Sequence, residues 1–159
     1  MRKQRINQIN VLLAIFSTSY LLNLLWEVAH SLLYDWNKFP LKNDIFYYIP
    51  KILRAALADA VIICFIFLLI CLFEKSFNWI HQPKKKEYLL ILILGFITAV
   101  FIEIRAKFLN LWDYNEYMPL VFSVGLTPLI QLSVTGIIAL SITNRLRIAA
   151  AWLFKSFTL

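Results

Sequence analysis

Four long apolar segments constrain this chain more than any other feature. They lie at about residues 11–33, 52–73, 88–107 and 119–142. Each is as long, or nearly as long, as the stretch of about 20 residues that an α-helix needs to cross the hydrocarbon core of a bilayer. With 61% hydrophobic and only 16% charged residues, the composition lies outside the usual balance of a soluble domain. The sequence therefore predicts an all-α, polytopic membrane protein, a single domain over residues 1–159 with four transmembrane helices in an antiparallel bundle.

The basic residues are distributed unevenly among the segments that join these helices. Ten of the 16 lysines and arginines precede the first apolar segment, lie between the second and third, or follow the fourth. Such basic segments stay on the cytoplasmic side, so both termini are predicted to be cytoplasmic, most simply in a bacterial plasma membrane, the cell inner membrane. This topology accounts for the net charge of +7. Because no basic face or motif is present, nucleic acid is not an expected partner.

The fourth segment carries two prolines and a basic tail. Pro119 suits the first turn of a helix, so the last transmembrane helix is predicted to begin there. Pro128 would remove a backbone donor inside that helix and is predicted to kink it. Residues 145–158 combine basic side chains with a tryptophan and are predicted to form a helix along the inner membrane surface.

A polar stripe runs along the first apolar segment. Steps of three or four residues place five side chains on one helix face: Tyr20, Asn23, Glu27, His30 and Tyr34. A carboxylate or an imidazole is costly against lipid, so this stripe must face protein or a water-filled cavity.

The second apolar segment also contains a carboxylate, that of Asp59. Arg54 is poorly placed to pair with it, because five residues put the two side chains about 140° apart round a helix. Asp59 is therefore expected to face Glu27 across the first two helices. It either accepts hydrogen bonds from neighbouring helices as a structural group, or serves a substrate, a proton or an ion.

The third and fourth segments add further polar groups. Glu103 lies at the end of the third, where it either pairs with Lys107 four residues later or faces the interior. Thr127 and Gln131 share one face of the fourth, where hydrogen bonding between helices is the simpler explanation. The two outer loops are rich in Trp and Tyr and form either an aromatic belt at the interface or a lid over a pocket.

When the helices alternate in direction, all these polar groups lie in the outer half, which predicts one shared pocket that opens outward. The candidates for acid–base catalysis are Asp59, Glu27 and His30. The candidates for ligand binding are Asn23, Glu103, Arg54, Trp112, Tyr114, Thr127 and Gln131.

Several functions could use such a pocket. It could bind a small or lipid-like ligand, with membrane lipid as a partner, and carry out acid–base chemistry on a lipid or isoprenoid. It could instead be a structural network in a non-catalytic membrane subunit, or handle ions or protons in a transporter. A further alternative is a divalent metal at Glu27, His30, Asp59 and Glu103, although only one motif of the Glu-x-x-His type is present. No other cofactor is expected, and the sequence leaves open whether the protein is an enzyme and what its oligomeric state is.

Overall fold

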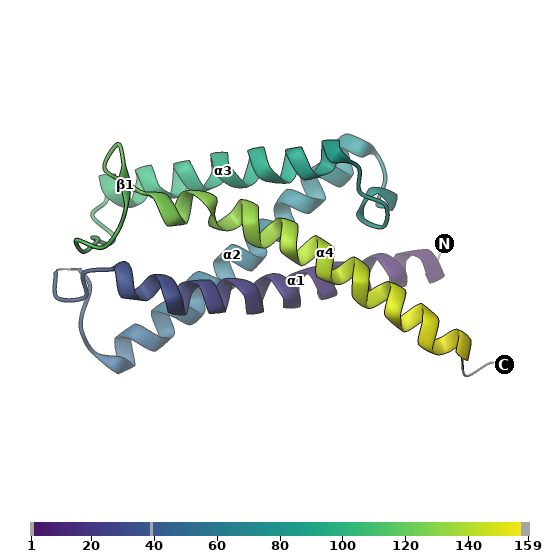
Figure 1. The fold of residues 1–159 in the computed structure, drawn as a ribbon, viewed down its shortest axis with the longest axis horizontal. Helices are drawn as coiled ribbons and strands as arrows, with labels where there is room; N and C mark the ends of the chain where they lie inside the picture. Colours follow the sequence, from purple (N-terminus) through teal and green to yellow (C-terminus); the bar gives the residue numbers. More distant parts are fainter. Residues whose placement is uncertain (1, 39, 157–159) are drawn as a thin grey trace.

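Four helices make up the fold (Figure 1): α1 (Arg2–His30), α2 (Ile45–Glu74), α3 (Lys85–Phe108) and α4 (Leu126–Ser156). This computed structural model describes the backbone of residues 2–38 and 40–156, and the side chains of residues 8–38 and 40–146. Two short 3-10 helices, Ser31–Leu33 and Asn78–Ile80, and a hairpin of strands β1 (Leu120–Val121) and β2 (Val124–Gly125) lie in the connections. As the sequence predicted, the four helices are long and apolar enough to span a membrane.

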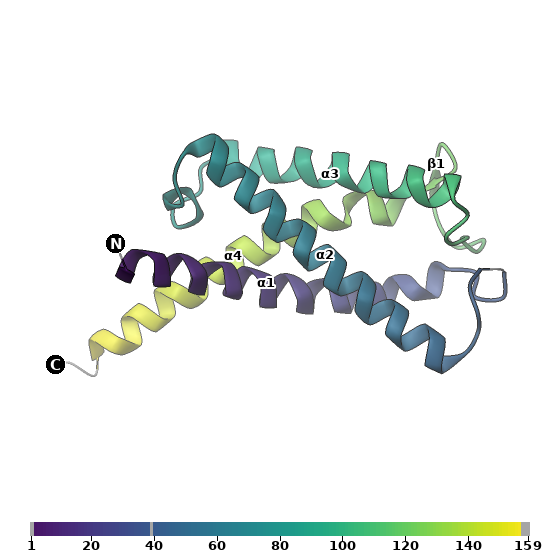
Figure 2. The ribbon, with the colours of Figure 1, turned by 180° about the vertical axis from the view of Figure 1, so that it is seen from behind.

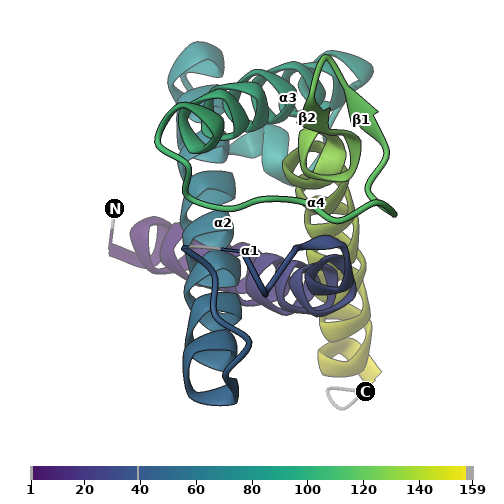
Figure 3. The same ribbon diagram turned by 90° about the vertical axis from the view of Figure 1, so that its left-hand side faces the viewer.

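The helices alternate in direction along the molecule. α1 and α3 follow the long axis, while α2 and α4 cross them obliquely from opposite sides (Figures 1 and 2). The start of α1, the end of α4 and the α2–α3 connection lie at one end of the molecule. The connections over residues 31–44 and 109–125 lie at the other end, which we call the loop end; Figure 3 looks onto it.

The apolar core lies mainly in the half away from the loop end. α3 packs along α4, and α1 packs along both α2 and α4. The core is formed by buried side chains from all four helices, among them Ile15, Ile63, Phe67, Ile91 and Leu140. α3 and α4 approach closely at Gly95, where a Cβ atom would lie 2.8 Å from the backbone nitrogen of Ser133. Small residues allow this kind of close helix crossing in membranes.

The outer surface of the helices is apolar. Only 22 to 50% of the most hydrophobic window of each helix is buried within the protein. Large side chains such as Leu25, 71% exposed, and Phe101, 69% exposed, point away from the core. An apolar surface this extensive is not typical of a soluble monomer and is suited to contact with lipid.

The second helix begins earlier than the apolar run indicates. It starts at Ile45 because Asp44 caps it, with Oδ1 accepting a hydrogen bond from the Phe46 backbone nitrogen at 2.9 Å. Pro50, which as a helix breaker would belong to the preceding loop, therefore lies inside α2. The expected start near residue 52 is late by about two turns of helix.

The expectations for the fourth helix need correction. Pro119 does not begin it: the chain first forms the β1–β2 hairpin, which turns at Phe122 and Ser123 with φ of 49° and 63°, and α4 starts at Leu126. Pro128 then falls in the first turn, where backbone N–H groups have no partner within the helix, so it removes no intrahelical hydrogen bond and no kink is expected from it. No separate tail helix is present among the described residues, because α4 continues to Ser156; residues 157–158 of the expected tail lie outside them.

Candidate functional site

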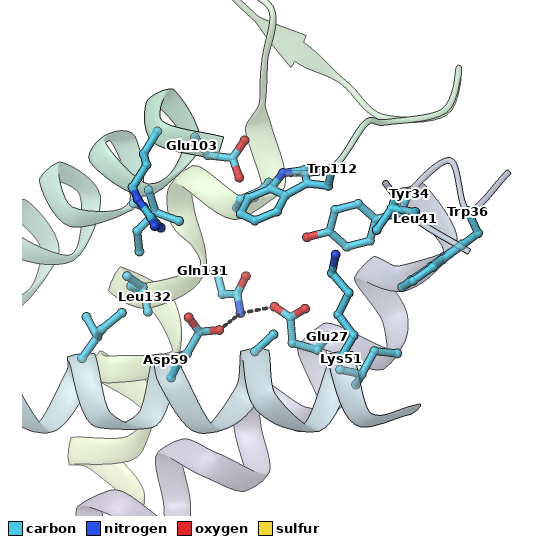
Figure 4. Close-up of a pocket in the computed structure, with 18 residues that line it drawn as sticks. Glu27, Tyr34, Trp36, Leu41, Lys51, Asp59, Glu103, Trp112, Gln131 and Leu132 are labelled. Atoms are coloured by element: carbon cyan, nitrogen blue, oxygen red, sulfur yellow. Dashed lines mark hydrogen bonds between the residues drawn. The ribbon is translucent and has the colours of Figure 1, made fainter. Parts of the chain in front are cut away.

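A cavity of about 320 Å³ lies among the four helices, beneath the loop end (Figure 4). Each helix contributes a carboxylate or an amide to its lining: Glu27 from α1, Asp59 from α2, Glu103 from α3 and Gln131 from α4. Aromatic side chains from the loops cover it on one side: Tyr34, Trp36 and Trp112. The remaining lining is mostly apolar, apart from Lys51 and Arg105. Four polar groups from four helices therefore meet at one level.

The Gln131 amide joins the first two helices. Its Nε2 donates to Asp59 Oδ2 at 2.7 Å and to Glu27 Oε1 at 2.8 Å, so the amide lies between the two carboxylates (Figure 4). Glu27 and Asp59 do not bond each other directly. Each has one oxygen on the amide, and the described residues give the other oxygen no hydrogen-bond donor. These two free oxygens line a cavity rather than a packed interior.

A second set of contacts holds the amide in place. Asn23 Oδ1 lies 3.2 Å from Gln131 Nε2, as a third and longer contact beside the two carboxylates, and 3.2 Å from Thr135 Oγ1, which lies nearer to the Gln131 carbonyl oxygen at 2.8 Å. The Asn23 amide donates to the Ser19 carbonyl oxygen one turn earlier at 2.9 Å. Asn23 is fully buried and lies one turn from Glu27 on α1. Its role is therefore to orient Gln131, since its own polar atoms are bonded within the protein.

Glu103 is bound by a phenol and not by a lysine. The Tyr114 hydroxyl lies 2.8 Å and 2.9 Å from the two carboxylate oxygens of Glu103, and the Trp112 indole N–H donates to the same hydroxyl at 3.0 Å. Burial raises the pKa of the Tyr114 phenol well above its usual value, and the neighbouring Tyr34 and Glu103 raise it further, so the phenol stays protonated and can donate. The alternative in which Glu103 pairs with Lys107 is wrong for this structure, where the described ion pairs include no such contact.

The two outer connections are joined above the cavity. The Asp35 backbone nitrogen donates to the Asp113 carbonyl oxygen at 3.0 Å, and the Asn115 side chain donates to the Leu32 carbonyl oxygen at 2.7 Å. The rings of Tyr34 and Tyr114 stack with centroids 5.3 Å apart. An ion pair between Lys38 and Asp113 adds to this at 2.9 Å and lowers the pKa of Asp113. The aromatic loops thus lie over the cavity as one connected layer.

The three cavity carboxylates have no cation beside them. Among the described side chains, no Lys, Arg or His nitrogen lies within 4.0 Å of Glu27, Asp59 or Glu103. A carboxylate removed from water is costly unless it is paired, protonated or bonded to a ligand. The cavity is therefore suited to a proton, a cation or a group that donates hydrogen bonds.

His30 does not join the acids. It follows Glu27 by three residues, which turns its side chain about 60° away round the helix. Its ring packs against Tyr34, with centroids 4.9 Å apart, and it lines a separate apolar groove between α1 and α4. Neither ring nitrogen has a hydrogen-bond partner among the described residues. The structure gives no contact through which His30 could assist Glu27 or Asp59.

Besides His30, four sequence candidates do not line the cavity: Asn23 and Tyr114, which contact residues that do, and Arg54 and Thr127. Two charged residues that line it were not among the candidates. Arg54 is exposed on α2, and Thr127 lines the groove of His30, donating to Met118 Sδ at 3.4 Å. Lys51 and Arg105 line the cavity instead. Lys51 could have been found from its spacing, since eight residues place it within about 80° of Asp59 round the helix.

The metal alternative gains no support from this geometry. The described part of the chain contains no group of three or more His, Cys, Asp or Glu side chains arranged to hold a metal ion. His30 faces away, and Glu103 is already bonded to Tyr114.

Comparison with known proteins finds no relative for this arrangement. No family model matches the chain, and neither a curated protein nor a solved structure matches it. The function must therefore be inferred from the site itself.

Proposed function

We propose that this is a multi-pass protein of a bacterial plasma membrane that binds a small or lipid-like ligand in the cavity of Glu27, Asp59 and Gln131. In this proposal the four helices form an antiparallel bundle across the bilayer, with both termini cytoplasmic and the loop end outside. The alternating helix directions, the apolar surface and the basic residues at the end opposite the loops support this placement.

One observation carries the binding function: two carboxylate oxygens face a cavity of about 320 Å³, and no described residue places a donor or a cation within bonding distance of them. A network that only held helices together would be closed, because unmatched buried polar groups are costly. The neighbouring Asn23 shows what such closure is like, with its polar atoms bonded to protein. The difference between Asn23 and the two acids favours a ligand site over a purely structural subunit.

Acid–base chemistry on the bound ligand is a second candidate, favoured by the same free oxygens. Asp59 and Glu27 would exchange the proton, and Gln131 would hold both carboxylates in position. His30 has no part in this proposal because its ring lines a different groove.

The test is to purify the full-length protein from membranes in mild detergent and to identify bound molecules by native mass spectrometry and lipid extraction. We expect a bound species that is retained by wild type and lost, at least tenfold, in Asp59→Asn and Glu27→Gln. Both changes keep the side-chain shape and an oxygen that accepts from Gln131. The matched control is Glu116→Gln, which alters an exposed loop acid and should leave binding unchanged.

Absence of any bound species in wild type, with the variants equally stable, would overturn the proposal in favour of a structural network. Equal retention by wild type and by both variants would remove the carboxylates from the site.

A further inference from the structure

Part of the cavity lining is exposed at the protein surface. Its lining includes Ala58 of α2 and Arg105 of α3, both exposed, and Ile62 and Ile102, both half-buried. α2 and α3 approach each other at the end that carries their connection and diverge toward the loop end (Figures 1 and 2). The joined outer loops cover the loop end itself. The exposed lining residues of α2 and α3 and the apolar helix surface around them favour access from the side, between these two helices.

Positive and negative groups occupy different levels of this cavity. Lys51 precedes Asp59 by eight residues and so lies about 12 Å nearer the loop end of α2. Its amine reaches into the cavity beside Tyr34, above the Glu27 carboxylate (Figure 4). Arg105 also lines the cavity, from α3. The Lys51 cation thus lies nearer the loop end, while Glu27 and Asp59 present free carboxylate oxygens below it.

This order of charges fits a head group that carries an anion and, beyond it, an ammonium. Resting on the function proposed above, we propose that the ligand is a phospholipid of the outer leaflet with a primary-amine head group. Its phosphate lies beside Lys51, and its ammonium donates to Glu27 and Asp59. A primary ammonium has three N–H donors for the two free oxygens, and a phosphate accepts charge-assisted hydrogen bonds from Lys and Arg.

The size and position of the cavity fit a head group but not a whole lipid. About 320 Å³ is at the lower end of the range for ligand pockets. The acyl chains would remain in the bilayer beside α2 and α3, since the opening faces the apolar surface. A head group with a phosphate but no amine would place a further negative charge near Glu27 and Asp59, and it would supply no ammonium to neutralise these two carboxylates.

The experiment reconstitutes the full-length protein in nanodiscs and measures the retained lipid by native mass spectrometry. The probes are dioleoyl lipids with phosphoethanolamine, phosphocholine or phosphoglycerol head groups, with dodecylamine as a competitor. We expect phosphoethanolamine lipid to be retained about tenfold or more over phosphoglycerol lipid, as one charge-assisted hydrogen bond allows. The quaternary phosphocholine head, which has no N–H donor, should also be retained less.

Variants separate the two halves of the site. Glu27→Gln with Asp59→Asn should reduce the preference for phosphoethanolamine to less than twofold. Lys51→Gln should weaken retention of all three phospholipids and leave the preference in place. Lys42→Gln and Glu116→Gln, at exposed loop positions, should change neither. Size-exclusion profiles identify any variant that does not fold, and dodecylamine competition tests the acids in the wild-type protein.

The outcomes distinguish this inference from the function on which it rests. Equal retention of phosphoethanolamine and phosphoglycerol lipids would overturn the amine assignment, while a different bound molecule lost in Asp59→Asn would still support a ligand site. Displacement by dodecylamine as readily as by phosphoethanolamine lipid would remove the phosphate from the proposal. No bound molecule of any kind would overturn both.

Discussion

Replacement of Gln131 by leucine tests the central network most directly. The change keeps the approximate volume but removes the amide that donates to Glu27 and Asp59. Glu27 is only 5% exposed and loses its one hydrogen bond. Asp59 is half-buried at the cavity and can take water instead, and Asn23 keeps its bond from Thr135. The cost is therefore that of about one buried acceptor left without a donor, roughly 1–3 kcal/mol.

The assay is reversible unfolding by sodium dodecyl sulfate in mixed micelles, followed by far-ultraviolet circular dichroism. Ser141→Ala is the matched control on the same helix, because the Ser141 hydroxyl donates only to the Ile137 carbonyl oxygen one turn earlier. It should change the free energy of unfolding by less than about 0.5 kcal/mol, because a single hydrogen bond in a membrane protein often contributes little to stability.

A double-mutant cycle separates the hydrogen bonds from packing. In the double variant Gln131→Leu, Glu27→Leu, the Glu27 carboxylate is absent, so α1 carries no buried carboxylate that has lost its donor. The double variant should therefore lose less free energy of unfolding than the sum of the losses in the two single variants, by about 1 kcal/mol or more. A Gln131→Leu variant as stable as Ser141→Ala, or full additivity in the cycle, would refute the assignment of Gln131 as the shared donor.

Three further predictions concern the helix crossing, the hairpin and the topology. Gly95→Ala should destabilise the protein by about 1–3 kcal/mol in the same unfolding assay, because its Cβ would lie 2.8 Å from the Ser133 backbone nitrogen; an unchanged midpoint would contradict the close α3–α4 crossing. Phe122→Asn should stabilise by about 1 kcal/mol, because Phe122 has φ of 49°, and a loss of stability would show that the exposed ring is more important than the backbone strain. Cysteine at Lys42 should react with a membrane-impermeant maleimide in sealed cells, and cysteine at Lys85 only after permeabilisation; the reverse pattern would overturn the proposed orientation.

The four helices could be predicted from the sequence because apolar length is a strong and local signal. Their ends were less predictable, since they depend on single contacts. Asp44 caps α2 one residue before Ile45, so the helix begins ahead of Pro50 although proline usually ends or kinks a helix. Before the start of α4, the two-residue turn at Phe122 and Ser123 has no glycine or asparagine, the usual signal for such a hairpin. Nothing local therefore distinguished this hairpin from the start of a helix.

The polar cavity was predictable in part. The cost of a carboxylate against lipid points Glu27 and Asp59 inward, and the stripe of Gln131 and Thr135 points toward them. The sequence could not show which group would lie between the two acids, because the oblique crossing of α2 and α4 decides that. Nor could it show that His30, three residues from Glu27, would turn away. The width of the face of α1 that points into the protein depends on how many helices pack around α1.

The Gln131 amide also constrains how the protein is made. Its partner Glu27 lies 104 residues earlier in the chain and its partner Asp59 lies 72 residues earlier. At about 5–20 residues per second, roughly 5–20 s pass between synthesis of Glu27 and synthesis of the residue that bonds it. During that interval α1 and α2 carry their acids without the donor they will have in the folded state. The first two helices therefore have to remain beside the insertion machinery, or hold these carboxyls protonated, until the last helix arrives and completes the fold.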